Sequence, residues 1–272
     1  MTLSGVTTTS PDPAADAAVE TATLLGSTTT TVPYSLAPDV RHVDGEDIFP
    51  IKDSKFDRSA NATLAELLAA AAMANLSADG NQISPFGQTY GAAVKNETRP
   101  LLSGPGWHGQ VIVEWQPYRG GHLVGRFVVG PAPPPGVDVY TSRLDVSSGL
   151  DPVDQEAMRA AESGGFEAVS ALLADELVTG LFPPAQVEAT INGPYPEAQL
   201  QELRYRQFAA VYGVSVADSA TAVDVQQTND ALTHALSHAI EADLSATFDS
   251  PKAAGDAVRL GTVTITIRTW SP

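Results

Sequence analysis

The sequence predicts an α+β fold: a mostly antiparallel sheet packed by four or five helices and preceded by an extended N-terminal arm. Three observations predict it. A β-hairpin pattern occupies residues 110–129, a strand pattern occupies residues 258–270, and several helical patterns lie between them. Because strand and helix patterns do not alternate regularly, a doubly wound parallel sheet is disfavoured.

The hairpin prediction depends on two runs of β-branched and aromatic residues. These runs, 111–115 and 123–129, flank a turn-rich segment at 117–121. A proline-rich stretch, 131–136, follows as a stiff connector and is a candidate sub-boundary within the domain. A further strand is expected at 137–146.

Capping signals mark where helices begin. Thr63 and Glu66 match a capping box and predict a helix that ends near Gly80. Asp151 followed by Pro152 predicts the start of another helix. A short strand is expected at 186–191. The remaining helices are predicted at 166–179, 196–212 and 227–247.

The strand at 258–270 shows the clearest period of two. Val263, Ile265 and Ile267 alternate with threonines, so one face is expected to be buried and the other hydrated. Upstream, the apolar residues fall in the opposite phase. That change of phase predicts a β-bulge near Gly261.

Residues 1–35 are predicted to be an extended arm, followed by a single α+β domain over 36–272. The arm contains ten Thr, four Ser and three Pro, and it has no basic residue. Such a segment buries too little apolar surface to offset its own ordering entropy. We therefore expect the arm to contact at least one neighbouring chain; the alternative is that it wraps around its own domain.

Charge limits the partners of the chain. Its 272 residues include 32 Asp plus Glu against 15 Lys plus Arg, giving a net charge of −17. Without a basic run, neither direct nucleic-acid binding nor attachment to an anionic membrane is expected. The first 20 residues show no signal-peptide pattern. The excess of Asp over Glu and of Arg over Lys resembles proteins of halophilic archaea or actinobacteria.

The best candidate site comprises His234, His238 and Glu241, which share one face of the predicted helix at 227–247. That face lies away from the apolar stripe of the same helix. A zinc-protease helix requires Glu directly after the first His, and Ala235 stands there instead. The trio is a weak metal candidate. An inter-subunit contact and a hydrated face are the other interpretations.

Two further patterns have simpler explanations. Residues 104–109 match G-x-G-x-x-G, but they precede a strand, so a tight turn is predicted in place of a dinucleotide site. The acidic residues of 39–47 lack the spacing of a calcium loop and are interpreted as hydrated charge. The chain has no cysteine, which excludes thiolate catalysis and cysteine-ligated metal sites.

These observations favour a non-catalytic structural subunit, without a cofactor, that assembles with copies of itself and with other subunits. A capsid, neck or tail component of a virus of a halophilic archaeon or actinobacterium fits this description. It would assemble in the host cytoplasm and reside in the virion. The alternatives are a metal-dependent hydrolase using His234, His238 and Glu241, and a monomeric binding module.

Overall fold

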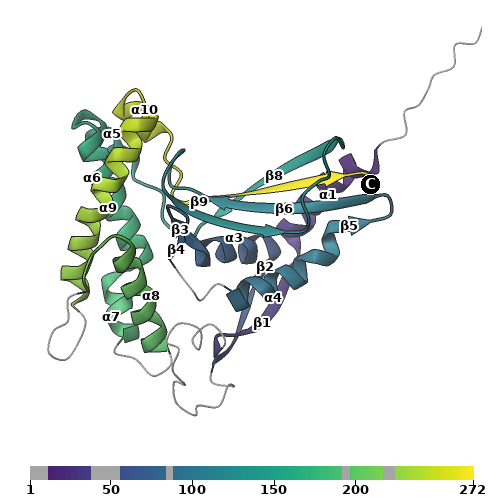
Figure 1. Ribbon diagram of the computed structural model, residues 1–272, viewed down its shortest axis with the longest axis horizontal. Helices are drawn as coiled ribbons and strands as arrows, with labels where there is room; N and C mark the ends of the chain where they lie inside the picture. The colour runs from purple at the N-terminus through teal and green to yellow at the C-terminus, as the bar shows by residue number, and fades with distance from the viewer. Residues whose placement is uncertain (1–11, 38–55, 84–87, 192–196, 217–223) are drawn as a thin grey trace, which may run out of the picture.

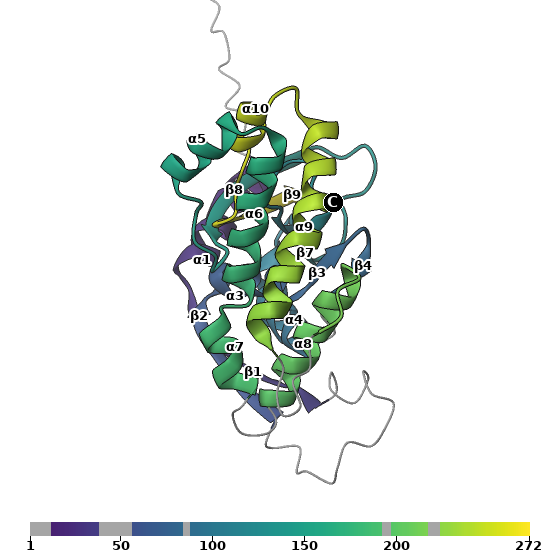
Figure 2. The same cartoon turned by 90° about the vertical axis from the view of Figure 1, so that its left-hand side faces the viewer.

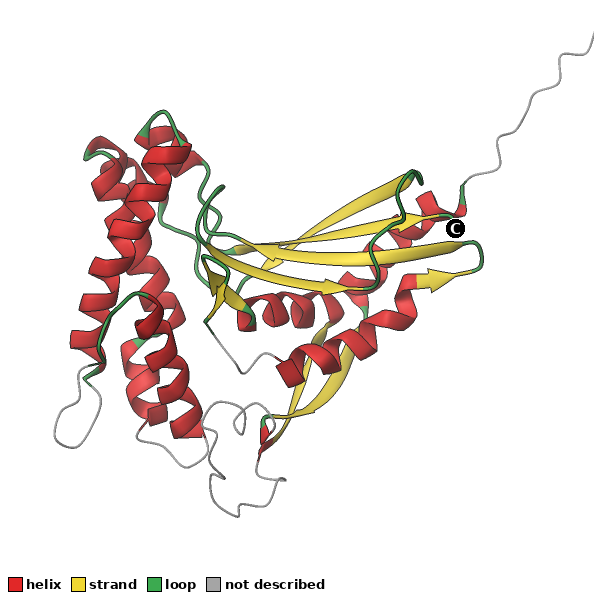
Figure 3. Cartoon of the chain, viewed as in Figure 1, coloured by secondary structure: helices red, strands yellow, loops and turns green. Residues whose placement is uncertain are grey.

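The computed structural model describes residues 12–37, 56–83, 88–191, 197–216 and 224–272. Within them, a seven-stranded sheet has the order β4–β3–β7–β6–β9–β8, with β5 paired to β6, while β1 and β2 pair separately (Figures 1 and 3). All the pairings are antiparallel. The α+β class is confirmed. The strands are β1 (Thr29–Ser35), β2 (Asp57–Thr63), β3 (Leu76–Ala78), β4 (Asn81–Gln82), β5 (Ser103–Gly104), β6 (Trp107–Trp115), β7 (Leu123–Val129), β8 (Val139–Ser147) and β9 (Thr262–Trp270).

The predicted hairpin is formed by β6 and β7. Val111 pairs with Val129 and Val113 with Phe127, so the apolar side chains face one layer. The 104–109 segment forms the turn between β5 and β6, as predicted. Residues 131–136 connect β7 to β8 within one sheet.

Strand β9 lies between β6 and β8, and its alternation is confirmed. Val263, Ile265 and Ile267 have no exposed surface. The predicted bulge near Gly261 is wrong, because β9 begins at Thr262 and a turn precedes it. Leu260 is buried through this turn, and its carbonyl accepts a hydrogen bond from Trp115 Nε1 at 2.8 Å.

Helices α1 (Pro13–Ser27), α3 (Leu64–Ala74) and α4 (Gln88–Thr98) lie beneath the sheet (Figure 1). The capping box at the start of α3 is present as predicted. This helix ends at Ala74, with Asn75 as its C-cap directly before β3, and so is shorter than predicted. A Cβ at Gly125 would lie 2.8 Å from the carbonyl oxygen of Ala72, so glycine permits the close approach of α3 to β7.

The predicted arm requires a correction. Residues 13–27 form α1 and residues 29–35 form β1, and both are ordered against this chain itself; residues 1–11 lie outside the described residues. The Asp12 carboxylate caps α1 and accepts a hydrogen bond from Tyr140 at 2.8 Å. Helix α1 packs against β8 and β9 through buried side chains that are mostly small, and these supply enough buried surface to order it: Ala14, Ala17, Ala18, Thr21 and Leu25.

A second group of helices lies at one end of the sheet (Figures 1 and 2). In the sequence, this group falls between β8 and β9. Helices α6 and α9 pack side by side along their lengths (Figure 2). The group comprises α5 (Gln155–Ser163), α6 (Phe166–Leu181), α7 (Pro184–Ile191), α8 (Glu197–Val211), α9 (Val225–Thr247) and α10 (Pro251–Asp256).

Three predictions in the irregular and helical regions were wrong. Residues 186–191 belong to helix α7, because Pro184 begins a helix there. Helix α5 begins at Gln155, because Asp154 accepts the capping hydrogen bonds that were assigned to Asp151. Residues 88–98 form α4 within a stretch expected to be irregular. No helix of the described ranges is long and apolar enough to cross a membrane.

Candidate functional site

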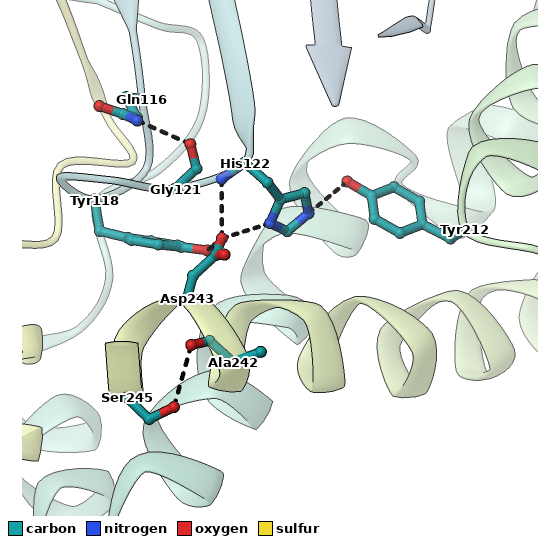
Figure 4. A network of polar contacts seen from close by, with 8 residues as sticks. All are labelled: Gln116, Tyr118, Gly121, His122, Tyr212, Ala242, Asp243 and Ser245. Atoms are coloured by element: carbon teal, nitrogen blue, oxygen red, sulfur yellow. Dashed lines mark hydrogen bonds and ion pairs between the residues drawn. The ribbon is translucent and has the colours of Figure 1, made fainter. Parts of the chain in front are cut away.

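A cluster of four polar side chains joins the β6–β7 turn to the helix group (Figure 4). We call Tyr118, His122, Tyr212 and Asp243 the junction cluster. One oxygen of Asp243 accepts hydrogen bonds from Tyr118 Oη at 2.9 Å, from the His122 backbone N–H at 2.9 Å and from His122 Nδ1 at 2.6 Å. His122 Nε2 lies 3.2 Å from Tyr212 Oη.

Burial shapes the electrostatics of the junction cluster. The His122 side chain is 8% exposed and that of Asp243 is 23% exposed, so both groups are largely removed from water. Burial raises the pKa of Tyr118, and the adjacent Asp243 charge raises this pKa further. Burial is also the main cause that raises the pKa of Tyr212. Both phenols therefore remain protonated and act as donors.

The hydrogen bond to Asp243 fixes the tautomer of His122. With Nδ1–H donated to the carboxylate, Nε2 is the ring atom that faces the Tyr212 hydroxyl. An Asp–His pair of this kind orients a general base in many enzymes. Here Nε2 faces a phenol, and none of the cavities described below is lined by His122. These hydrogen bonds hold the β6–β7 turn against helix α9, which is a structural role.

The predicted trio lies on α9 at its exposed side. His234 and His238 are exposed, Glu241 is half-buried, and the two imidazole rings meet edge to face with centroids 4.6 Å apart. The predicted orientation away from the apolar stripe is thus observed. Across the described ranges, no group of three or more His, Cys, Asp or Glu is arranged to hold a metal ion. The acidic segment 39–47 lies outside the described residues.

Sequence reasoning missed the junction cluster, although one signal was present. Asp243 lies three residues after Ile240 and directly before Leu244, both of which are buried along the apolar stripe of α9. A carboxylate at the border of a buried stripe requires a partner. The partner itself was not readable, because His122 is 121 residues away in the sequence.

A second candidate surface is the edge strand β8, which pairs only with β9. Alternate residues from Val139 to Ser147 are exposed on the side of the sheet opposite α1. Arg143 and Asp145 lie two residues apart on this exposed side, opposite Thr266 and Thr264 of β9. Within the described chain, no other strand pairs with the outer edge of β8, so its backbone groups are available to a further strand.

A family model described as "Family of unknown function (DUF7284)" matches residues 1–270. The chain belongs to this family. No curated protein and no solved structure matches the DUF7284 chain.

Proposed function

We propose that this chain is a non-catalytic structural subunit that assembles through the edge of β8. The observation that carries the proposal is a nine-residue strand, paired on one side only, at the end of a broad antiparallel sheet. An unpaired strand edge is a template for β-augmentation by another chain. The assembly we favour is a virus particle or a comparable large complex, a choice supported by the acidic composition and not by any one contact.

The contact surface differs from the one expected from sequence. Strand β9 is paired on both sides and has no free edge, and α1 with β1 packs against this chain. Strand β9 therefore offers no edge to a neighbouring chain, whereas β1, among the described residues, pairs only with β2 in a separate two-stranded sheet and is shorter than β8. The proposal therefore rests on β8 and not on the N-terminal arm that the sequence predicted as the contact.

The sequence of β8 is complementary to itself in an antiparallel pair centred on Leu144. In that register Arg143 of one copy lies opposite Asp145 of the other, and the same pair recurs across the two-fold axis. Opposite charges on facing strands stabilise a sheet by about 0.2–1 kcal/mol per pair, and like charges destabilise it. The proposed partner is thus a second copy of the chain, which extends the sheet across the interface.

Charge reversal tests the register. We expect the wild-type chain to self-associate, and Arg143→Asp or Asp145→Arg alone to weaken association about tenfold, because two attractive pairs become repulsive. The double variant, Arg143→Asp with Asp145→Arg, restores the two attractive pairs and should regain affinity. Sedimentation velocity over a concentration series measures each dissociation constant.

Arg126→Asp is the matched control, because Arg126 lies on β7, in the interior of the sheet, where it pairs with Glu114. Its association should equal that of the wild type. A monomeric wild-type chain, or a double variant no tighter than the single variants, refutes pairing through β8.

A further inference from the structure

Arg204 is an unusual cation in this acidic chain. It lies on α8, is largely buried, and places its guanidinium 5.9 Å from the ring centroid of Phe182. No carboxylate of the described residues pairs with it, whereas Arg206 on the same helix pairs with Glu202 at 2.8 Å. Burial lowers the pKa of Arg204, and no anion among the described residues opposes that shift.

An unpaired, largely buried guanidinium destabilises a protein, because the charge loses hydration without gaining a counter-ion. A guanidinium remains charged even when its pKa is lowered. Its planar N–H groups form a fork that fits the two oxygens of a carboxylate or phosphate. Arg204 therefore retains unused donors at a position where an anion would remove the destabilisation.

Two cavities have Arg204 as a common lining residue. One, of about 260 Å³, is lined by parts of α6, α7 and α8 and by the segment after β8. Gln186 and Gln201 line this cavity together with Arg204, and their side-chain amides make no hydrogen bond within the described ranges. This cavity supplies further donors next to the charge.

The other cavity, of about 370 Å³, is mostly apolar. Its walls are Tyr34 and Tyr90, whose rings meet edge to face with centroids 5.0 Å apart, and small side chains of α3. The Tyr90 hydroxyl is already donated to the Leu67 carbonyl, so the ring faces offer apolar contact. An apolar cavity with one charged group at its wall is the usual form of a site for a small amphiphilic ligand.

We propose that Arg204 is the anchor of a binding site for a small organic carboxylate with an apolar body. The carboxylate accepts hydrogen bonds from the Arg204 guanidinium and from the Gln186 and Gln201 amides. Its apolar body lies against Tyr34, Tyr90 and the alanines of α3. This site does not use the exposed side chains of β8, although Ser148 and Gly149, directly after β8, line one of its cavities.

Calorimetric titration with octanoate tests the site, with octan-1-ol as the uncharged probe of the same length and acetate as the charged probe without an apolar body. We expect saturable binding of octanoate, and binding of octan-1-ol or acetate weaker by about tenfold or more. Absence of saturable octanoate binding overturns the proposal. So does octan-1-ol binding as tight as that of octanoate, because the charge would then contribute nothing.

Variants locate the binding. Arg204→Met keeps the length of the side chain and removes the charge, so octanoate affinity should fall about tenfold or more. Its melting temperature should be no lower than that of the wild type, because an unpaired buried charge has been removed. The matched control, Arg206→Met, lies on the same helix outside both cavities and should bind octanoate like the wild type.

A second variant tests the apolar cavity without changing any charge. Ala70 lines that cavity from the exposed side of α3, so Ala70→Phe is expected to fold and to fill the space. Octanoate affinity should fall in this variant, while acetate binding stays the same. Unchanged octanoate affinity in either Arg204→Met or Ala70→Phe refutes the site.

Discussion

The two flanks of α9 both carry polar, ionisable side chains, but in opposite surroundings. On one flank, Asp243 is largely buried and accepts three hydrogen bonds from the β6–β7 turn. On the other, His234 and His238 contact mainly each other, at the surface. Only the first flank joins separate parts of the molecule. Spacing on a helix shows which residues share a face, whereas burial and partners decide whether that face has a role.

The largest expected effect comes from Asp243→Ala. Loss of the carboxylate leaves two donors of His122 and the Tyr118 hydroxyl without an acceptor in a largely buried position. We expect a decrease of about 3 kcal/mol in the free energy of unfolding, measured by urea denaturation. Asp230→Ala, at an exposed position of the same helix, is the control and should change stability by less than about 0.5 kcal/mol. Equal effects of the two variants would remove the contrast between the flanks.

Tyr118→Phe removes one of the three donors and keeps the buried ring. We expect a decrease of about 1 kcal/mol in the free energy of unfolding, because Asp243 retains its two hydrogen bonds from His122. Combining Tyr118→Phe with Asp243→Ala in a double-mutant cycle measures the coupling of the pair. Strictly additive effects would show that the phenol and the carboxylate do not interact.

Glu66, at the start of α3, is an exposed carboxylate that contrasts with the largely buried Asp243 and makes stability depend on pH. Hydrogen bonds from the Thr63 backbone and hydroxyl hold the pKa of Glu66 below its ordinary value. Its contribution to stability is therefore present above about pH 4.3, the value for an unfolded Glu, and is lost as pH falls through the lower folded pKa. Glu66→Gln cannot ionise, so the stability difference between the two proteins should be constant above about pH 5 and should change only below it. A difference that changes near neutral pH would contradict this assignment.

The smallest effect is expected from the double variant His234→Ala with His238→Ala. Both side chains are exposed, so the free energy of unfolding should change by less than about 0.5 kcal/mol. Metal content after dialysis against zinc, measured by mass spectrometry, should equal that of the wild type. Stoichiometric zinc that disappears in the double variant would restore the metal-dependent hydrolase as the better hypothesis.

Capping signals show both the strength and the limit of prediction from sequence. The capping box at Thr63 and Glu66 was readable, because both of its partners lie within one helical turn. The pair Asp12–Pro13 carries the same start signal as Asp151–Pro152 and does begin a helix, whereas the helix near Asp151 begins at Gln155. The composition around Asp12 predicted disorder. Residues 13–27 nevertheless form a helix, because α1 packs against β8 and β9, and this packing cannot be read from the local sequence.

The junction cluster and the surroundings of Arg204 could not be predicted from the sequence, for the same reason. Each consists of residues from distant segments of the chain, and no local sequence pattern shows that such residues are in contact. Alternation in β9 was readable, since period two survives whatever the neighbours are. Its place between β6 and β8 was not, because strand order depends on the path of the whole chain.

The position of β9 has a consequence for how the chain folds. Strands β6 and β8 are both synthesised well before β9, yet in the native sheet they are separated by it. Until residues 262–270 have been synthesised, the strand that separates β6 from β8 in the native sheet is missing. The six helices of the second group lie between β8 and β9 in the sequence, so this pairing joins segments that are far apart along the chain. Contacts between segments so far apart in sequence slow folding and prolong the exposure of unpaired strand edges. We therefore expect the sheet to be completed late, only once β9 is free to pair, with the edges of β6 and β8 at risk of aggregation in the interval.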